Sequence, residues 1–224
     1  MFKLNTFMIT VILTLTLIGG NIASADYFAY RENKWDHEPL ICLLKPENYK
    51  DFKQYGITMG KMVQAINIWK QKLNQYTESS NWNYSIKVLP TYTSMLEYDC
   101  DVRIEISNFG GKSFGQIDCY VIDERQFCDI VIYDQPANYF LGTITHEVGH
   151  ALGLGHRLPW TKCDFAAVIL SNDIMMKDSI KHPVITDESL RALIQFYGDD
   201  GFKTPNPVVG DNKYWITEKP LICA

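Results

Sequence analysis

Positive charge is in short supply in this sequence. Lysines and arginines number 21, against 26 aspartates and glutamates, which gives a formal net charge of -5 over 224 residues. A protein that binds the phosphate backbone needs the opposite balance, so nucleic-acid binding has no electrostatic support. The sequence also has no internal repeat and no low-complexity segment, and its hydrophobic content of 46% is typical of a folded globular protein.

Long apolar runs are missing beyond the first 25 residues. The run from Phe7 to Ile18 follows the positive Lys3 and precedes the small residues Ala23 to Ala25. Its length of about twelve residues is short of the roughly 18 that a membrane-spanning helix needs, so residues 1–25 are interpreted as a secretory signal peptide rather than an uncleaved anchor. Removing them takes away Lys3 alone, and the net charge changes from -5 to -6. We expect a secreted protein without a membrane anchor.

The cysteines lack the CxxC spacing of common zinc sites. Six cysteines follow residue 25, and an even count in a secreted protein favours up to three disulfides. The best-supported pair is Cys119 with Cys128, because residues 114–134 resemble two strands joined by a charged turn. The partners of the other four stay open: Cys42, Cys100, Cys163 and Cys223.

Hydrophobic spacing predicts both helices and strands, and thus an α+β fold. Residues 57–76 have a stripe at helical spacing that indicates an amphipathic helix, formed by Met62, Ile66, Trp69 and Leu73. Strands are expected at residues 39–44, 84–89 and 101–107, and as a pair within 114–134.

Further helices are expected in the second half of the chain. One begins near Pro136 or Ala137, and another runs from the N-cap Thr186 to Gly198. Residues 26–38 are interpreted as a short aromatic and charged lead, and residues 157–185 as an irregular loop. Residues 199–224 are a tail rich in Gly, Pro and Asn.

Histidine is also scarce, yet three of the five histidines fall in "HEVGHALGLGH", residues 146–156. Because a helix advances about 100° per residue, His146 and His150 project from the same side and can bind one ion. Glu147 follows His146 and is rotated from it by one residue of the helix. Its carboxylate can therefore take a proton from a metal-bound water without being a ligand itself. Gly153 permits a positive φ, so the chain can leave the helix and bring His156 back as a third ligand.

Three neutral imidazoles leave the fourth position of a tetrahedral zinc for water, as in a catalytic site. Zinc can lower the pKa of that water to about 7 and polarise a carbonyl, which permits hydrolysis of a peptide bond. A bare HExxH pattern occurs by chance in helices. The longer pattern HExxHxxGxxH fixes five positions at once and is far more specific.

The same residues resemble the zinc-binding sequence of the metzincin metallopeptidases, and among them the matrixins. "NDIMMK" is similar to the Met-turn of that family, with Met175 a better match than Met176, and "SLRALIQFYG" is similar to its final helix. The resemblance implies His146, His150 and His156 as zinc ligands and Glu147 as general base.

The resemblance also implies the architecture, a single metallopeptidase domain over residues 26–224. An upper part (about 39–153) would hold a twisted mixed sheet with long helices. A small irregular lower part (about 154–198) and the tail (199–224) would follow, with the active-site cleft between the two parts. An edge strand near Phe114 to Val121 would pair with an extended substrate.

Several family features are missing. Arg157, after the third histidine, leaves the subfamily open, and Lys177 stands where astacins and serralysins have a tyrosine ligand. No cysteine switch is recognisable, and "NFGGKSFGQID" contains no histidine for a second zinc. We predict one zinc and leave structural calcium open, because acids such as Asp118 and Asp123 are isolated.

The remaining candidates are weaker. His37 and His182 are interpreted as surface or loop histidines, Asn83 meets the glycosylation pattern, and Glu188 belongs to the first turn of a helix. The sequence therefore predicts a secreted, monomeric zinc endopeptidase that acts on proteins or peptides. The alternative is an extracellular binding or adhesion module that zinc stabilises without turnover.

Overall fold

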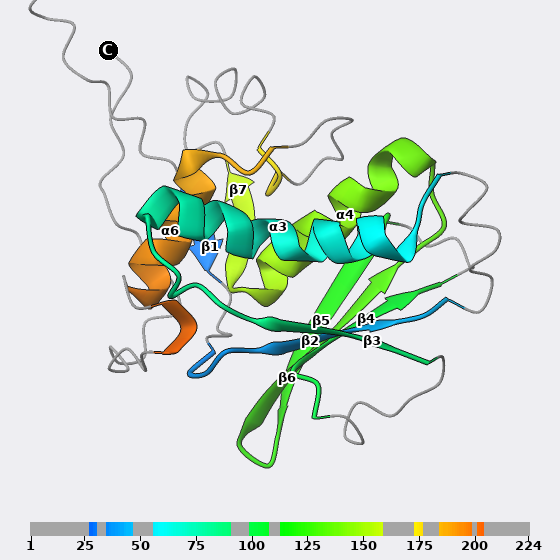
Figure 1. Cartoon of the computed structure of the whole chain (residues 1–224), viewed down its shortest axis with the longest axis horizontal. Helices are drawn as coiled ribbons and strands as arrows, with labels where there is room; N and C mark the ends of the chain where they lie inside the picture. The colour runs from blue at the N-terminus through cyan, green and yellow to red at the C-terminus, as the bar shows by residue number, and fades with distance from the viewer. Residues whose placement is uncertain are drawn as a thin grey trace, which may run out of the picture.

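The computed structural model describes residues 27–30, 35–46, 56–90, 99–107, 113–158, 173–176, 184–198 and 201–203. These residues form an α+β fold with a mixed five-stranded sheet, a separate two-stranded sheet and three α-helices (Figure 1). The predicted signal peptide, most of the predicted irregular loop (157–185) and most of the tail lie outside the described residues. Across the described helices, none combines the length and apolarity needed to cross a membrane.

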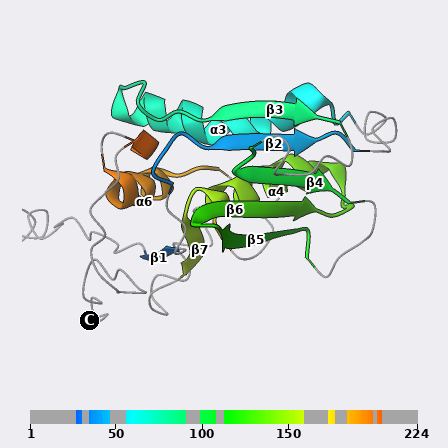
Figure 2. The same ribbon diagram turned by 90° about the horizontal axis from the view of Figure 1, so that it is seen from below.

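The large sheet has the strand order β3-β2-β4-β6-β5, which Figure 2 shows from below. Its strands are β2 (Leu40–Leu44), β3 (Ser85–Leu89), β4 (Val102–Ile106), β5 (Gly115–Ile122) and β6 (Arg125–Ile132). The first four in spatial order run parallel, and β5 pairs antiparallel with β6 at one edge. The predicted mixed sheet is confirmed, with β5 as an edge strand.

Two long helices lie on the same side of this sheet (Figure 1). They are α3 (Met59–Thr77) and α4 (Ala137–Ala151). The four apolar residues predicted for the core face of α3 are all fully buried. The helices are tied together because Trp69 Nε1 donates to Thr145 O at 2.8 Å and Thr145 Oγ1 donates to Ala65 O at 3.1 Å.

The third helix, α6 (Asp187–Tyr197), begins at the predicted N-cap. The side-chain oxygen of Thr186 accepts from Ser189 N, and two acids occupy the first turn, where the helix dipole favours them. A 3₁₀ turn, η2 (Gly201–Lys203), follows and buries Phe202 against Trp82 and Tyr197.

A second, two-stranded sheet was not predicted. Strand β1 (Tyr27–Tyr30) pairs antiparallel with β7 (Leu154–Leu158), beside α6 (Figures 1 and 2). The expected lead at 26–38 therefore contains a strand, and the expectation of irregular structure from residue 157 is wrong for residues 157 and 158. Both strands are too short to show a clear alternation of apolar and polar residues. They also lie more than a hundred residues apart in the sequence.

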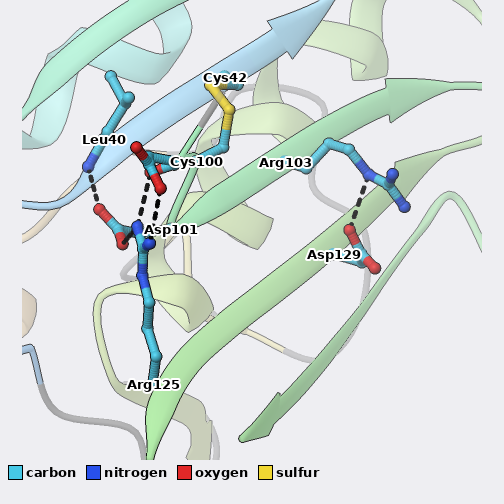
Figure 3. The surroundings of a disulfide bond; sticks show 8 residues. Leu40, Cys42, Cys100, Asp101, Arg103, Arg125 and Asp129 are labelled. Carbon is cyan, nitrogen blue, oxygen red and sulfur yellow. Dashed lines mark hydrogen bonds and ion pairs between the residues drawn. A yellow bond between two sulfur atoms is a disulfide. The ribbon is translucent and has the colours of Figure 1, made fainter. Parts of the chain in front are cut away.

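Two disulfides cross-link the large sheet. The hairpin disulfide joins Cys119 to Cys128, a directly opposed pair on β5 and β6, and confirms the predicted pairing. The sheet disulfide joins Cys42 of β2 to Cys100, just before β4 (Figure 3). Within the described residues no cysteine is free. Cys163 and Cys223 lie outside them.

A charged cluster surrounds the buried carboxylate of Asp101, next to the sheet disulfide (Figure 3). Its oxygens accept from Leu40 N at 2.7 Å and from Arg125 Nη2 at 3.1 Å, and His37 Nε2 lies at 3.3 Å. Arg125 also pairs with Asp99 at 3.0 Å. The cluster ties together the amino-terminal ends of β2, β4 and β6.

Candidate metal centre

Three histidines converge from α4 and β7. His146 and His150 lie one turn apart on α4, and His156 comes from β7. The ring centroids are 4.6, 4.7 and 5.3 Å apart, and one nitrogen of each ring lies within 4.8 Å of the others. These three side chains could hold a metal ion.

The turn after α4 brings the third histidine back. Gly153 has a φ of 106°, a conformation that favours glycine, and its N–H donates to His150 O at 3.0 Å. The chain enters β7 at the next residue, and His156 follows two residues later. The role expected for Gly153 is therefore seen in the structure.

Backbone carbonyls orient two of the three rings. His146 Nδ1 lies 2.5 Å from Ile174 O, and His150 Nδ1 lies 2.6 Å from Leu154 O. A carbonyl oxygen only accepts, so in the neutral rings each Nδ1 carries the proton and each Nε2 presents a lone pair to a metal.

One pair of histidine nitrogens has the separation found between two ligands of a tetrahedral zinc ion. His150 Nε2 and His156 Nε2 are 3.3 Å apart. With Zn–N distances of about 2.0–2.1 Å, a tetrahedral ion separates two nitrogen ligands by about 3.3–3.4 Å. This pair therefore has the spacing that two ligands of one tetrahedral ion require.

Glu147 is buried against the edge strand of the sheet. The residue is 6% exposed, and its side chain packs against Gly115, the first residue of β5. A Cβ at Gly115 would lie 2.5 Å from Glu147 Oε1 and 2.8 Å from its Cγ. The missing side chain at Gly115 thus provides the space for the carboxylate, a role that the sequence alone did not suggest.

Met175 lies in a turn formed by residues 173–176, against α4. It is fully buried, whereas Met176 is half-buried, so the better-matched candidate is the one in the core. A Cβ at Gly149 would lie 2.5 Å from Met175 Sδ and 2.8 Å from Trp69 Cζ2. Gly149 therefore allows Met175 to lie directly against the helix that carries two of the histidines.

Two aromatic residues hold the end of α4, a role that was predicted from the sequence for neither of them. Trp35 Nε1 donates to Ala151 O at 2.8 Å, and the Tyr197 hydroxyl donates to Leu152 O at 3.0 Å. These carbonyls belong to the last turn, which lacks partners within the helix. Burial raises the pKa of Tyr197 far above its usual value, so the hydroxyl stays a donor. The sequence pointed to these contacts only in a general way, because buried Trp and Tyr side chains usually have a polar partner.

The other sequence candidates lie elsewhere. His37 belongs to the Asp101 cluster, and Asn83 Nδ2 donates to Glu38 Oε2 at 2.8 Å. Arg157 pairs through its backbone with Phe28 in the small sheet. Asp118 and Asp123 join no metal-ligand group among the described residues. His182 and Lys177 lie outside the described residues.

Comparison with known proteins gives no match: no protein-family model fits the sequence, and no curated protein is significantly similar to it.

Proposed function

We propose that the protein is a secreted zinc-dependent endopeptidase of the metzincin type, similar to the matrixins. The observation that carries the proposal is the combination of three converging histidine nitrogens with a buried glutamate beside an edge strand. A buried carboxylate is costly to desolvate, and a site that only stored zinc would not need one at position 147. Glu147 therefore favours an enzyme over a binding module.

In the proposed reaction the histidines, Glu147 and the edge of β5 have different roles. His146, His150 and His156 would hold zinc, which supplies a Lewis acid that activates water and polarises the peptide carbonyl. Glu147 takes a proton from the attacking water and passes it to the leaving amine. The outer edge of β5 can pair with an extended peptide, and this would bring the substrate backbone past Glu147 at Gly115.

The surrounding fold supports this assignment. A mixed sheet, long helices and a buried methionine against the histidine helix are features that the resemblance implies. Two disulfides fit an oxidising compartment, in agreement with secretion.

The test compares the wild-type protein with Glu147→Gln, both assayed for bound zinc and for cleavage of a reduced, alkylated protein. Loss of the base is expected to lower turnover by about 10²-fold or more while zinc stays stoichiometric. Glu105→Gln makes the same change at an exposed position on β4 and should leave both readouts unchanged. Stoichiometric zinc with no cleavage by any form would establish the binding module instead.

A further inference from the structure

We propose that Asp173 is a positioning residue for the metal centre, acting on His146 through one peptide group. The inference rests on the proposed zinc site. Asp173 is fully buried, precedes Met175 by two residues and belongs to the turn that contacts α4. Neither the pattern of the histidine motif nor the Met-turn resemblance assigns it a role.

The carboxylate of Asp173 connects this turn to the start of α6. Oδ1 accepts from Met175 N at 2.7 Å, and Oδ2 accepts from the hydroxyls of Ser189, at 2.8 Å, and Thr186. Both hydroxyls belong to the N-terminal turn of α6, where the helix dipole also favours a negative charge. Three donors and the dipole compensate the buried charge and fix the carboxylate in place.

The link to His146 is the peptide bond between Ile174 and Met175. Its N–H donates to Asp173 Oδ1, and its carbonyl oxygen lies 2.5 Å from His146 Nδ1. A planar trans peptide directs its N–H and C=O in opposite directions, so Asp173 and His146 bind the two ends of one rigid group. Ile174 N also donates to Val184 O at 2.7 Å, which holds the preceding peptide.

This arrangement affects both geometry and electronics. If the carboxylate is removed, the Ile174 carbonyl can rotate away from His146 Nδ1, and the ring loses its fixed orientation. A negative charge on the N–H side also polarises the peptide and strengthens the carbonyl as an acceptor. In other proteins, carboxylates hydrogen-bond directly to metal-binding histidines and orient them. Asp173 would have the same effect indirectly, through the Ile174–Met175 peptide.

The experiment measures zinc affinity by chelator competition and the visible spectrum after cobalt substitution, on the full chain. Asp173→Asn keeps the shape and removes the charge; we expect about tenfold weaker zinc binding and a changed cobalt spectrum. Leu190→Ala is the control, because it removes a buried side chain from α6 without touching the peptide. It should lower the melting temperature and leave zinc affinity and the cobalt spectrum unchanged.

The outcomes are distinguishable. Wild-type zinc affinity and an unaltered spectrum in Asp173→Asn would overturn the positioning role alone, as would a change in zinc affinity that Leu190→Ala reproduces. Absence of zinc binding by the wild-type protein would overturn the proposed function and this inference with it.

If Asp173→Asn does not fold, NMR of the wild-type protein tests the proposal through the exchange and chemical shifts of two protons. The Met175 amide and the His146 Nδ1 proton should both resist exchange and shift together when zinc is added. A Met175 amide that exchanges freely or ignores zinc would contradict the proposal.

Discussion

Replacing Gly149 with alanine should destabilise the protein, although alanine is the better helix former. In a helix interior the exchange alone would stabilise by up to about 1 kcal/mol. Here the new methyl carbon would lie 2.5 Å from Met175 Sδ and 2.8 Å from Trp69 Cζ2, and both side chains are fully buried. Overpacking of this kind costs about 1–3 kcal/mol. We expect a net loss of about 1 kcal/mol.

The assay is chemical denaturation of metal-free wild type, Gly149→Ala and a matched control. Gly60→Ala makes the same change on α3 at an exposed position, where the nearest atom would be Thr58 Oγ1 at 3.8 Å. That variant should be as stable as the wild type or slightly more stable. Gly149→Ala should unfold at lower denaturant and bind zinc more weakly, because displacing Met175 moves the Ile174 carbonyl.

A double variant separates the clash from other causes. Met175→Ala alone should cost about 2–5 kcal/mol by leaving a cavity. Combined with Gly149→Ala, the methyl group enters space that Met175 has left, so the double variant should lose about 1 kcal/mol less than the sum. The packing argument would be refuted if the losses of unfolding free energy were strictly additive. It would also be refuted if Gly149→Ala stabilised the protein as much as Gly60→Ala does.

Two further predictions concern the large sheet. Replacing both cysteines of the Cys42–Cys100 disulfide should cost roughly 4 kcal/mol, against about 2.5 kcal/mol for the hairpin disulfide, because their sequence separations are 58 and 9 residues; equal losses of unfolding free energy would contradict the loop-entropy explanation. For His37, burial opposes the charged form, but the hydrogen bond with Asp36 and the charge of Asp101 outweigh it and raise the pKa. A raised pKa stabilises the fold fully below the unfolded value of 6.5 and loses this effect as pH rises through the folded value, so the stability difference between wild type and His37→Gln should shrink over that interval; a difference that grows with pH would show the sign to be wrong.

Local pattern was sufficient to predict the helices, most strands and the convergence of three histidines. The stripe on α3, the β5–β6 pair with Cys119 and Cys128, and the positive φ of Gly153 each depend on neighbours within one element or one turn. Helical spacing also places His146 and His150 together without any tertiary information.

The supports of the site could not be predicted because their partners are distant in sequence. Trp35 contacts Ala151 across 116 residues, and Gly115 and Glu147 lie on β5 and α4 with the whole of β6 between them in the sequence. Asp173 resembles an ordinary surface acid in the sequence, and only packing shows that it is buried and bound to α6. Such contacts have no period, so no local pattern reveals them.

The caps on α4 have a consequence for damaged molecules. Trp35 belongs to the first part of the described chain and Tyr197 to the last helix, and both hold the turn that delivers His156. A molecule cleaved so that it loses Trp35 or Tyr197 would retain the three histidines and Glu147. It would lose one of the two side-chain hydrogen bonds that hold this turn. If the three histidines hold a metal as proposed, the ion should dissociate before the rest of such a molecule unfolds, so metal release would report the loss of either contact.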